Sequence, residues 1–219
     1  MVRWIQDSVR IERGLPMAGL NALTKISYGL YLLTAREGEK ENGCIINTPV
    51  QITGDPEVIS IAVNKRNYTH DMILRTGDFD LSVLTEKVPF SFFQRFGFQS
   101  GRDTDKFAGF YPVLLSANGL PYAPEFANAF ISGRVKAALD QGTHTLFLAD
   151  VTESAVLSDD PSVTYAYYFA HIKPKPAEAP RKKGFVCNIC GYIYEGEELP
   201  PDFVCPICKH GAADFSPIG

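Results

Sequence analysis

Runs of β-branched and aromatic residues, separated by short turn signals, fill the chain from about residue 20 to residue 172. Such runs are typical of β-strands. Two other segments, 68–77 and 88–97, have the character of short helices, and Thr69 and Gly77 supply the start and stop signals of the first. A mostly-strand pattern with one or two short helices favours a closed barrel. Strands are predicted at 25–37, 43–53, 57–64, 79–85, 111–116, 128–137, 144–153 and 164–170.

The pattern stops at residues 173–183, which read KPKPAEAPRKK. A segment rich in proline and basic residues stays extended and solvated, so it is predicted to be a linker. Residues 184–219 are too few to fold on apolar burial alone, and a bound metal would supply the missing stability. We therefore predict a mainly β domain over 1–172, a linker over 173–183 and a small metal-bound domain over 184–219.

Composition narrows the class of protein. Of the 219 residues, 45% are hydrophobic and 21% are charged, which is ordinary for a globular protein. The net charge of −4 argues against a nucleic-acid partner. The N-terminal stretch lacks the apolar run of a signal peptide, and no stretch is long enough to span a membrane, so a cytoplasmic protein is predicted. There is no GxGxxG motif after a strand and no P-loop, which argues against those nucleotide-binding domains.

Four of the five cysteines form two Cys-x-x-Cys pairs near the C-terminus, Cys187 with Cys190 and Cys205 with Cys208. Both sulfurs of such a pair can point at one centre, and four thiolates make a closed tetrahedral site for zinc or iron. Spacing alone leaves two readings open, a structural zinc ribbon and an iron site that carries electrons.

The residues around the pairs favour the second reading. CGYIY follows the first pair, PPDFVCPIC spans the second, and Phe215 lies in a D-F step after it. These residues resemble rubredoxin, with a shorter connection that is closer to the rubredoxin domain of rubrerythrins. The resemblance implies one iron held by the four cysteines, which would carry a single electron.

A second feature is the sequence NKRNYTHD at the start of the first predicted helix. Lys65 and Arg66 precede the hydroxyl of Thr69, and the N-terminus of a helix attracts anions such as phosphate. The alternative is that Thr69 only caps the helix while the two basic side chains are solvated.

The order of motifs in the first domain resembles the flavin reductase family, whose members bind FMN in a split β-barrel. The motifs are Thr34–Arg36, GCIINT, DPEVISIAV, YTHDMIL, SGRDTDKF and HTLFLADV, and together they cover about 20–170. The resemblance implies a homodimer, with FMN at the subunit interface and NADH or NADPH as the electron donor.

The family pattern also implies site residues. Ile46, Asn47 and Thr48 would line the isoalloxazine edge, and Gln51 and Thr53 would lie towards the ribityl chain and phosphate. The phosphate would be held by Asn64, Lys65, Thr69 and His70, with Lys106 as a further candidate. His144 is a possible nicotinamide contact, although members usually carry Asp where this chain has Thr143. Cys44 is predicted only to pack in the core.

The two resemblances together predict an electron route. Hydride delivers two electrons at once, a four-cysteine iron accepts one, and FMN converts between them. The pairing resembles proteins of anaerobic bacteria that feed a flavodiiron reductase of O2 or nitric oxide. The prediction is thus an NAD(P)H-oxidising flavoprotein with a rubredoxin iron centre. Two alternatives stay open: an FMN-binding protein with a structural zinc ribbon, and an electron carrier that a separate reductase reduces.

Overall fold

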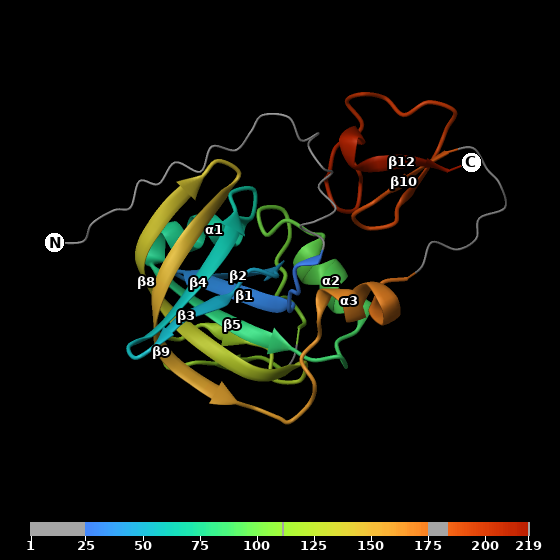
Figure 1. The fold of residues 1–219 in the computed structure, drawn as a ribbon. Coiled ribbons are helices and arrows are strands. Elements are labelled where there is room, and N and C mark those ends of the chain that lie inside the picture. Colours follow the sequence, from blue (N-terminus) through green and yellow to red (C-terminus); the bar gives the residue numbers. More distant parts are fainter. Residues whose placement is uncertain (1–24, 111, 175–183, 219) are drawn as a thin grey trace, which may run out of the picture.

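A computed structural model of the chain describes residues 25–110, 112–174 and 184–218 (Figure 1). The first domain contains nine strands and three short helical segments. They are β1 (Tyr31–Glu37), β2 (Lys40–Ile46), β3 (Val50–Gly54), β4 (Glu57–Asn64), α1 (Tyr68–Thr76), β5 (Asp78–Leu84), α2 (Phe90–Gly97), β6 (Leu114–Leu115), β7 (Pro121–Tyr122), β8 (Ala127–Gln141), β9 (His144–Val156), and α3 (Tyr165–Tyr167) with its π-helical continuation Tyr168–Ile172.

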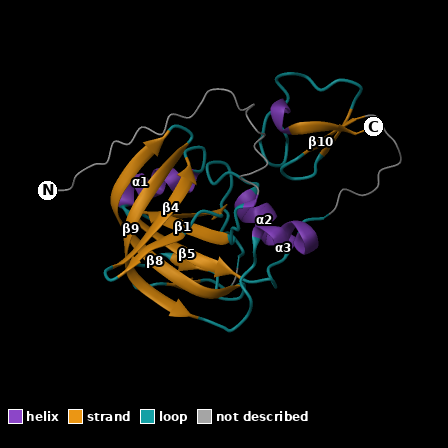
Figure 2. Ribbon diagram, viewed as in Figure 1, coloured by secondary structure: helices purple, strands orange, loops and turns teal. Residues whose placement is uncertain are grey.

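Seven of these strands form one antiparallel sheet in the order β2-β1-β5-β8-β9-β4-β3. The sheet curls on itself, so that β2 and β3 are its two edges, and within the described residues no ladder joins them (Figure 2). The result is a barrel that is split at one seam, as the family resemblance implied, whereas the strand pattern alone favoured a closed barrel. The long β8–β9 hairpin lies in the middle of the sheet, away from the seam, and register shifts between its two strands let it bend.

Two sequence predictions were wrong in detail. The predicted strand 43–53 is two strands, because the chain breaks at Asn47–Pro49 and Pro49 cannot donate to a ladder. The predicted strand 164–170 is helical, and the Thr164 hydroxyl caps it by accepting a hydrogen bond from the Tyr167 amide at 3.1 Å. The aromatic run there suits a strand by propensity, but it packs as a short helix against α2, with the Tyr168 and Phe93 rings 4.6 Å apart.

The first domain has two apolar clusters. One fills the barrel and contains the fully buried side chains of Leu33, Ile61, Phe79 and Phe147. The second lies between the barrel end and α2, whose aromatic side chains at positions 92, 93 and 96 point inward. It fixes the end of α2, from which the chain continues into the loop at 98–104.

The second domain is small. It contains a three-stranded sheet in the order β11-β10-β12, with β10 at Gly184–Cys187, β11 at Ile193–Glu195 and β12 at Phe215–Ile218, and a short 3-10 helix at Ala212–Asp214. Its apolar cluster is built around cysteine sulfurs and is too small to hold the fold by itself. Nowhere in the described part of the chain does a helix combine the length and apolar character needed to cross a membrane.

One buried carboxylate on β5 makes stability pH-dependent. Asp80 is fully buried opposite Ser132 of β8, and burial raises its pKa to about 6 although Asn118 donates a hydrogen bond to it. The unfolded value is about 3.9, so the folded state holds a proton that the unfolded state has lost between these two pH values. The free energy of unfolding should therefore fall by about 3 kcal/mol in total as pH rises from about 3 to about 7, with most of the fall between about pH 4 and 6.

Asp80→Asn is expected to remove this step and to raise the free energy of unfolding at pH 7. The new amide can donate to the Ser132 hydroxyl, which has no hydrogen-bond partner within the described residues. Urea titrations of both proteins at several pH values measure the effect. Parallel pH profiles for the two proteins would contradict this assignment.

Candidate functional site

The four cysteines of the second domain converge as predicted. They come from two equivalent turns, here called the first cysteine turn (Cys187–Cys190) and the second cysteine turn (Cys205–Cys208). In each, the amide that follows the second cysteine donates to the carbonyl of the first, Gly191 to Cys187 and Lys209 to Cys205, both at 2.9 Å. The turns are thus closed by backbone hydrogen bonds.

The sulfur geometry fits a tetrahedral metal site. All four Sγ atoms lie within 4.8 Å of one another, and the Cys187–Cys208 and Cys190–Cys205 pairs are 3.5 Å apart. Sulfurs bound at about 2.3 Å from one metal ion lie about 3.8 Å apart in a regular tetrahedron. Burial raises the pKa of the Cys190 thiol to about 11. Burial acts on Cys205 in the same sense, but the amides of Cys208 and Ile207 and the neighbouring thiols lower its pKa overall.

Aromatic side chains cover this centre. Phe203 packs edge-on against Phe215 at 5.3 Å and lies 4.7 Å from the ring of Tyr194. Tyr192 and Phe215 also contact the cysteine cluster. Cys187 and Cys205 are almost fully buried, whereas Cys190 and Cys208 lie nearer the surface. A dry, closed site without an open coordination position suits electron transfer and provides no place for a substrate.

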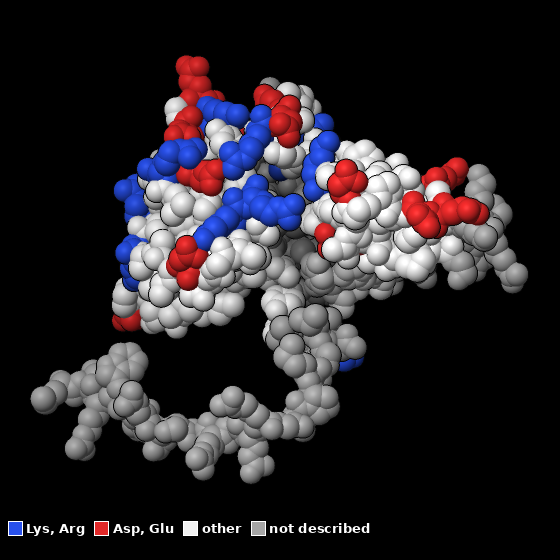
Figure 3. All heavy atoms as spheres, turned by 90° about the horizontal axis from the view of Figure 1, so that it is seen from above, with Lys and Arg blue, Asp and Glu red and all other residues white. Residues whose placement is uncertain are grey.

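The first domain presents a cavity of about 570 Å³ beside α1, here called the cationic cavity. Its walls come from β2, the loop before α1, the loop at 98–104 and the second cysteine turn. Figure 3 shows basic side chains of the first domain grouped around the hollow between the two domains. The charged and polar residues that line the cavity are Asn42, Asn64, Arg66, Asn67, Gln99, Ser100, Arg102, Asp103, Lys106, Lys209 and His210.

Buried polar groups fix the inner wall of the cationic cavity. The Asn42 amide donates to the Thr69 hydroxyl at 2.8 Å, while its Oδ1 has no hydrogen-bond partner within the described residues. Lys106 is 3% exposed and donates to the carbonyls of Gly43 and Phe96 at 2.8 and 3.1 Å. Burial lowers the pKa of Lys106. The cationic rim is what an anionic group of a ligand requires, and the free acceptor on Asn42 could take a hydrogen bond from an N–H or O–H of the same ligand.

A second cavity of about 670 Å³ is mostly apolar and is lined by Tyr28, Asn47, Tyr165 and Phe169, among others; it is here called the apolar cavity. Tyr165 lines both cavities, so they adjoin at its ring. A cationic end for a phosphate and an apolar end for a flat ring are what FMN requires, and the residues present therefore fit FMN.

The structure distributes the predicted phosphate residues over different environments. Asn64 lines the cationic cavity, and its side chain accepts from the Arg66 amide at 2.9 Å. Lys65 instead pairs with Asp140 at 2.6 Å on the surface. The His70 ring is buried between Thr145 at 2.8 Å and Asp71 at 3.0 Å. The phosphate-binding roles of these residues stay predictions, as do those of Thr69 and Lys106.

The predicted ring-edge residues occupy the break between β2 and β3. Ile46 is buried in the barrel core, Asn47 lines the apolar cavity, and the Thr48 hydroxyl contacts both backbone groups of Ala62 at 2.8 and 3.1 Å. Gln51 and Thr53 lie on the edge strand β3, where Gln51 is exposed. Their roles also stay predictions.

Sequence reasoning did not single out several cavity residues. Arg102, whose guanidinium pairs with Asp71 at 2.5 Å, lines the cationic cavity although only its motif was recognised. Tyr165 fell within the predicted strand 164–170 and was not named as a site residue. His144, at the start of β9, contacts the Thr143 hydroxyl at 2.9 Å and lies outside both cavities. Arg102 and Tyr165 reach the cavity residues of segment 42–67 only through tertiary packing. No spacing along the sequence could therefore have identified them.

Comparisons with known proteins agree with this geometry. The family model "Flavin reductase like domain" matches residues 23–175, and the model "Rubrerythrin, rubredoxin-like domain" matches residues 185–216. A "High molecular weight rubredoxin" from Moorella thermoacetica is 37% identical over 90% of this chain and 98% of its own length. A "Ferric-chelate reductase (NAD(P)H)" from Archaeoglobus fulgidus is 37% identical over 71% of this chain and 92% of its own.

Among solved structures, an FMN-binding protein from Thermus thermophilus aligns with a TM-score of 0.57 and 22% identity, over 65% of this chain and 77% of its own. Likeness at this identity concerns the fold, and it supports the assignment of the split barrel.

Proposed function

This chain belongs to the flavin reductase-like family and carries a rubredoxin-like domain, and from this premise we propose that it oxidises NADH or NADPH and passes the electrons through its iron centre to a partner protein. The protein is an oxidoreductase with FMN and one four-cysteine iron as cofactors and NAD(P)H as electron donor. Bound FMN supplies the conversion between a two-electron donor and a one-electron acceptor. The chain's own residues position the two centres.

One observation carries the proposal. Cys208 of the metal site lines the same cavity as Asn64 and Arg66 of the barrel. FMN with its phosphate in this cavity would have its ring in the adjoining apolar cavity, whose Tyr165 and Phe169 also line a small cavity with Ile189 of the first cysteine turn. The ring would then lie beside the metal domain, and no further carrier would be needed between the two centres. A zinc ribbon that served only stability would have no reason to present a metal ligand to this cavity.

Residues of the barrel would perform the binding. Arg66 and Arg102 would attract the phosphate, with help from the free amides at the start of α1, because charge-assisted hydrogen bonds are strong. Asn47 and Tyr165 would hold the ring in the apolar cavity, which excludes water from its faces. The buried Lys106 would keep the inner wall in place through its two carbonyl contacts.

The outgoing partner is proposed to be a flavodiiron-type protein, and the barrel is proposed to form a homodimer. The exposed apolar side chains of Val50 and Ile52 on the edge strand β3 support the homodimer, since an exposed apolar edge strand tends to pair with another chain. Acidic side chains gather on the outer end of the rubredoxin-like domain (Figure 3), which would favour a partner with a basic surface.

An anaerobic titration with NADH and NADPH tests the proposal, with visible spectra recorded and metal content determined on the same sample. We expect both the flavin and the iron bands to bleach. If the flavin bleaches but the rubredoxin-like domain contains zinc, even after expression in iron-replete medium, the zinc-ribbon alternative is supported. If neither centre responds, the chain is not a reductase and a separate donor reduces it.

A pair of adjacent substitutions tests the flavin site. Arg66 lines the cationic cavity, whereas Lys65 is paired with Asp140 outside it. Arg66→Ala should raise the dissociation constant for FMN about tenfold or more, since a hydrogen bond to a charged group is worth roughly 1.5–3 kcal/mol. Lys65→Ala should change it less than about threefold. Fluorescence titration of the apoprotein with FMN measures both, and the reverse order would assign the phosphate to Lys65.

A further inference from the structure

Lys209, directly after the second cysteine turn, has an unusual backbone. Its φ is 60°, and it is the one non-glycine residue with positive φ among those the structure describes. At the equivalent place after the first cysteine turn the chain has Gly191, with φ 81°. A left-handed backbone is unfavourable for a residue with a Cβ and easy for glycine. Glycine would adopt this backbone more easily, so the presence of lysine suggests that its side chain has a functional role.

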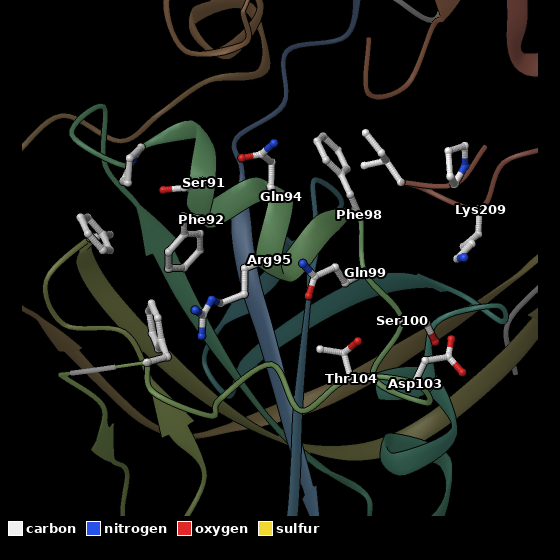
Figure 4. Close-up of a pocket in the computed structure, with 15 residues that line it drawn as sticks. Ser91, Phe92, Gln94, Arg95, Phe98, Gln99, Ser100, Asp103, Thr104 and Lys209 are labelled. Carbon is white, nitrogen blue, oxygen red and sulfur yellow. The ribbon is translucent and has the colours of Figure 1, made fainter. Parts of the chain in front are cut away.

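The surroundings of Lys209 indicate that task. Lys209 lines the cationic cavity and also a neighbouring cavity of about 830 Å³ between α2 and the second cysteine turn, here called the interdomain cavity. Ser100 and Asp103, from the loop after α2, line the same two cavities. Figure 4 shows the Lys209 side chain extending from the rubredoxin-like domain towards Ser100 and Asp103. An ammonium group thus faces a carboxylate across the domain boundary.

An aromatic contact lies beside this charged pair. Phe98, the residue that ends α2, packs against the cluster formed by Cys187, Cys205 and Cys208. Ile207 of the second cysteine turn and Ile189 of the first line cavities that Phe98 also lines. Phe98 therefore reaches the metal site from the barrel side, next to both turns.

A third contact ties the first cysteine turn to the barrel. The Lys173 ammonium donates to the carbonyl of Asn188 at 3.1 Å. The Phe98 and Lys173 contacts and the facing Asp103 and Lys209 side chains all join the barrel domain to the two cysteine turns. These turns carry the more accessible sulfurs, Cys190 and Cys208.

We propose that Phe98 and Asp103 form a docking site for the chain's own rubredoxin-like domain, with Lys209 as its polar anchor, and that docking places Cys208 at the cationic cavity and Ile189 beside Tyr165 of the apolar cavity. The inference rests on the proposed function and names the internal partner of its flavin site. One aromatic contact, one hydrogen bond and two facing opposite charges make a weak interface, because exposed charges attract each other only weakly in water. A weak interface suits a carrier domain, which has to leave before Cys190 and Cys208 can meet an outside acceptor.

A charge exchange in the full-length oxidised protein, loaded with FMN and iron, tests the docking directly. Amide hydrogen exchange of the peptides covering 98–104 and 205–210 reports docking without any catalytic turnover. Asp103→Lys and Lys209→Asp should each raise exchange in both peptides several-fold, and the double variant should return it to the original level. Glu57→Lys, at the exposed first position of β4, is the matched control and should change nothing.

Lys209→Gly separates docking from folding. It removes the ammonium but relieves the left-handed backbone, so the rubredoxin-like domain should keep its metal and its thermal stability while exchange in 98–104 rises. Phe98→Ala should raise exchange in the same peptides. Unchanged exchange in both single charge reversals, or a double variant no better protected than either, would overturn the proposal.

Stopped-flow mixing with NADH under anaerobic conditions separates a failure of the docking proposal from a failure of the proposed function. In Lys209→Asp at saturating FMN, iron bleaching should slow about tenfold relative to flavin bleaching. If the original protein shows no flavin bleaching at all, the proposed function fails, while the exchange data still decide docking. Equal slowing of both centres would count against a role confined to docking.

Discussion

Cys205→Ser is expected to abolish metal binding and to unfold residues 184–218, while the barrel keeps its flavin. Cys205 is fully buried, and the cluster around it contains the other three cysteines and only a few apolar side chains. Structural four-ligand sites of this kind contribute on the order of 10–16 kcal/mol of binding free energy, far more than so small an apolar cluster can replace. Metal analysis, the visible spectrum and hydrogen exchange of the small domain measure the result.

Cys44→Ser is the matched control for this experiment. Cys44 is also buried, but it lies on β2 in the barrel core, outside the four-cysteine group. Cys44→Ser should leave the metal content at one ion per chain and lower the free energy of unfolding of the barrel by about 1 kcal/mol. A Cys205→Ser protein that kept a full metal complement would show that three sulfurs suffice, and the small domain would then be held by something other than the closed site.

Gly133→Ala is expected to destabilise the barrel by about 2–3 kcal/mol. Gly133 on β8 lies opposite Phe79 on β5, and a Cβ at this glycine would stand 2.4 Å from the Phe79 ring. The ring is fully buried in the main core cluster, so it has no open space into which it can turn. Urea unfolding followed by circular dichroism measures the change, and loss of bound FMN should follow the same transition.

Two further variants test whether crowding against Phe79 causes the loss of stability in Gly133→Ala. Gly54→Ala places its Cβ no closer than 3.6 Å to a neighbour, on the exposed edge strand β3, and should change stability by less than about 0.5 kcal/mol. Phe79→Leu combined with Gly133→Ala should recover part of the lost stability, because the shorter side chain leaves room for the methyl group. If the double variant shows only the sum of the two single losses, crowding against Phe79 is not the cause.

Much of this protein was readable from its residues in order. Cys-x-x-Cys pairs are local, so Cys187, Cys190, Cys205 and Cys208 were identified from spacing as the metal ligands, and their sulfurs lie within 4.8 Å of one another. Strands β4, β5 and β9 and both longer helices were found near their predicted bounds, because period and turn residues are local signals too. The helix at Tyr165 was missed because its aromatic residues favour a strand until they pack against α2.

The tertiary structure decided what surrounds each polar group. Lys65 and Arg66 are neighbours in sequence, yet only the fold turned Arg66 into the cationic cavity and Lys65 towards Asp140, 75 residues away. Lys106 was foreseen as a phosphate candidate, and packing buried its amino group against two carbonyls. The approach of Phe98 and Asp103 to the second cysteine turn joins segments about 100 residues apart. Local sequence determines strands, turns and metal ligands because their geometry is local, whereas cavities and docking surfaces arise from long-range packing that no spacing rule encodes.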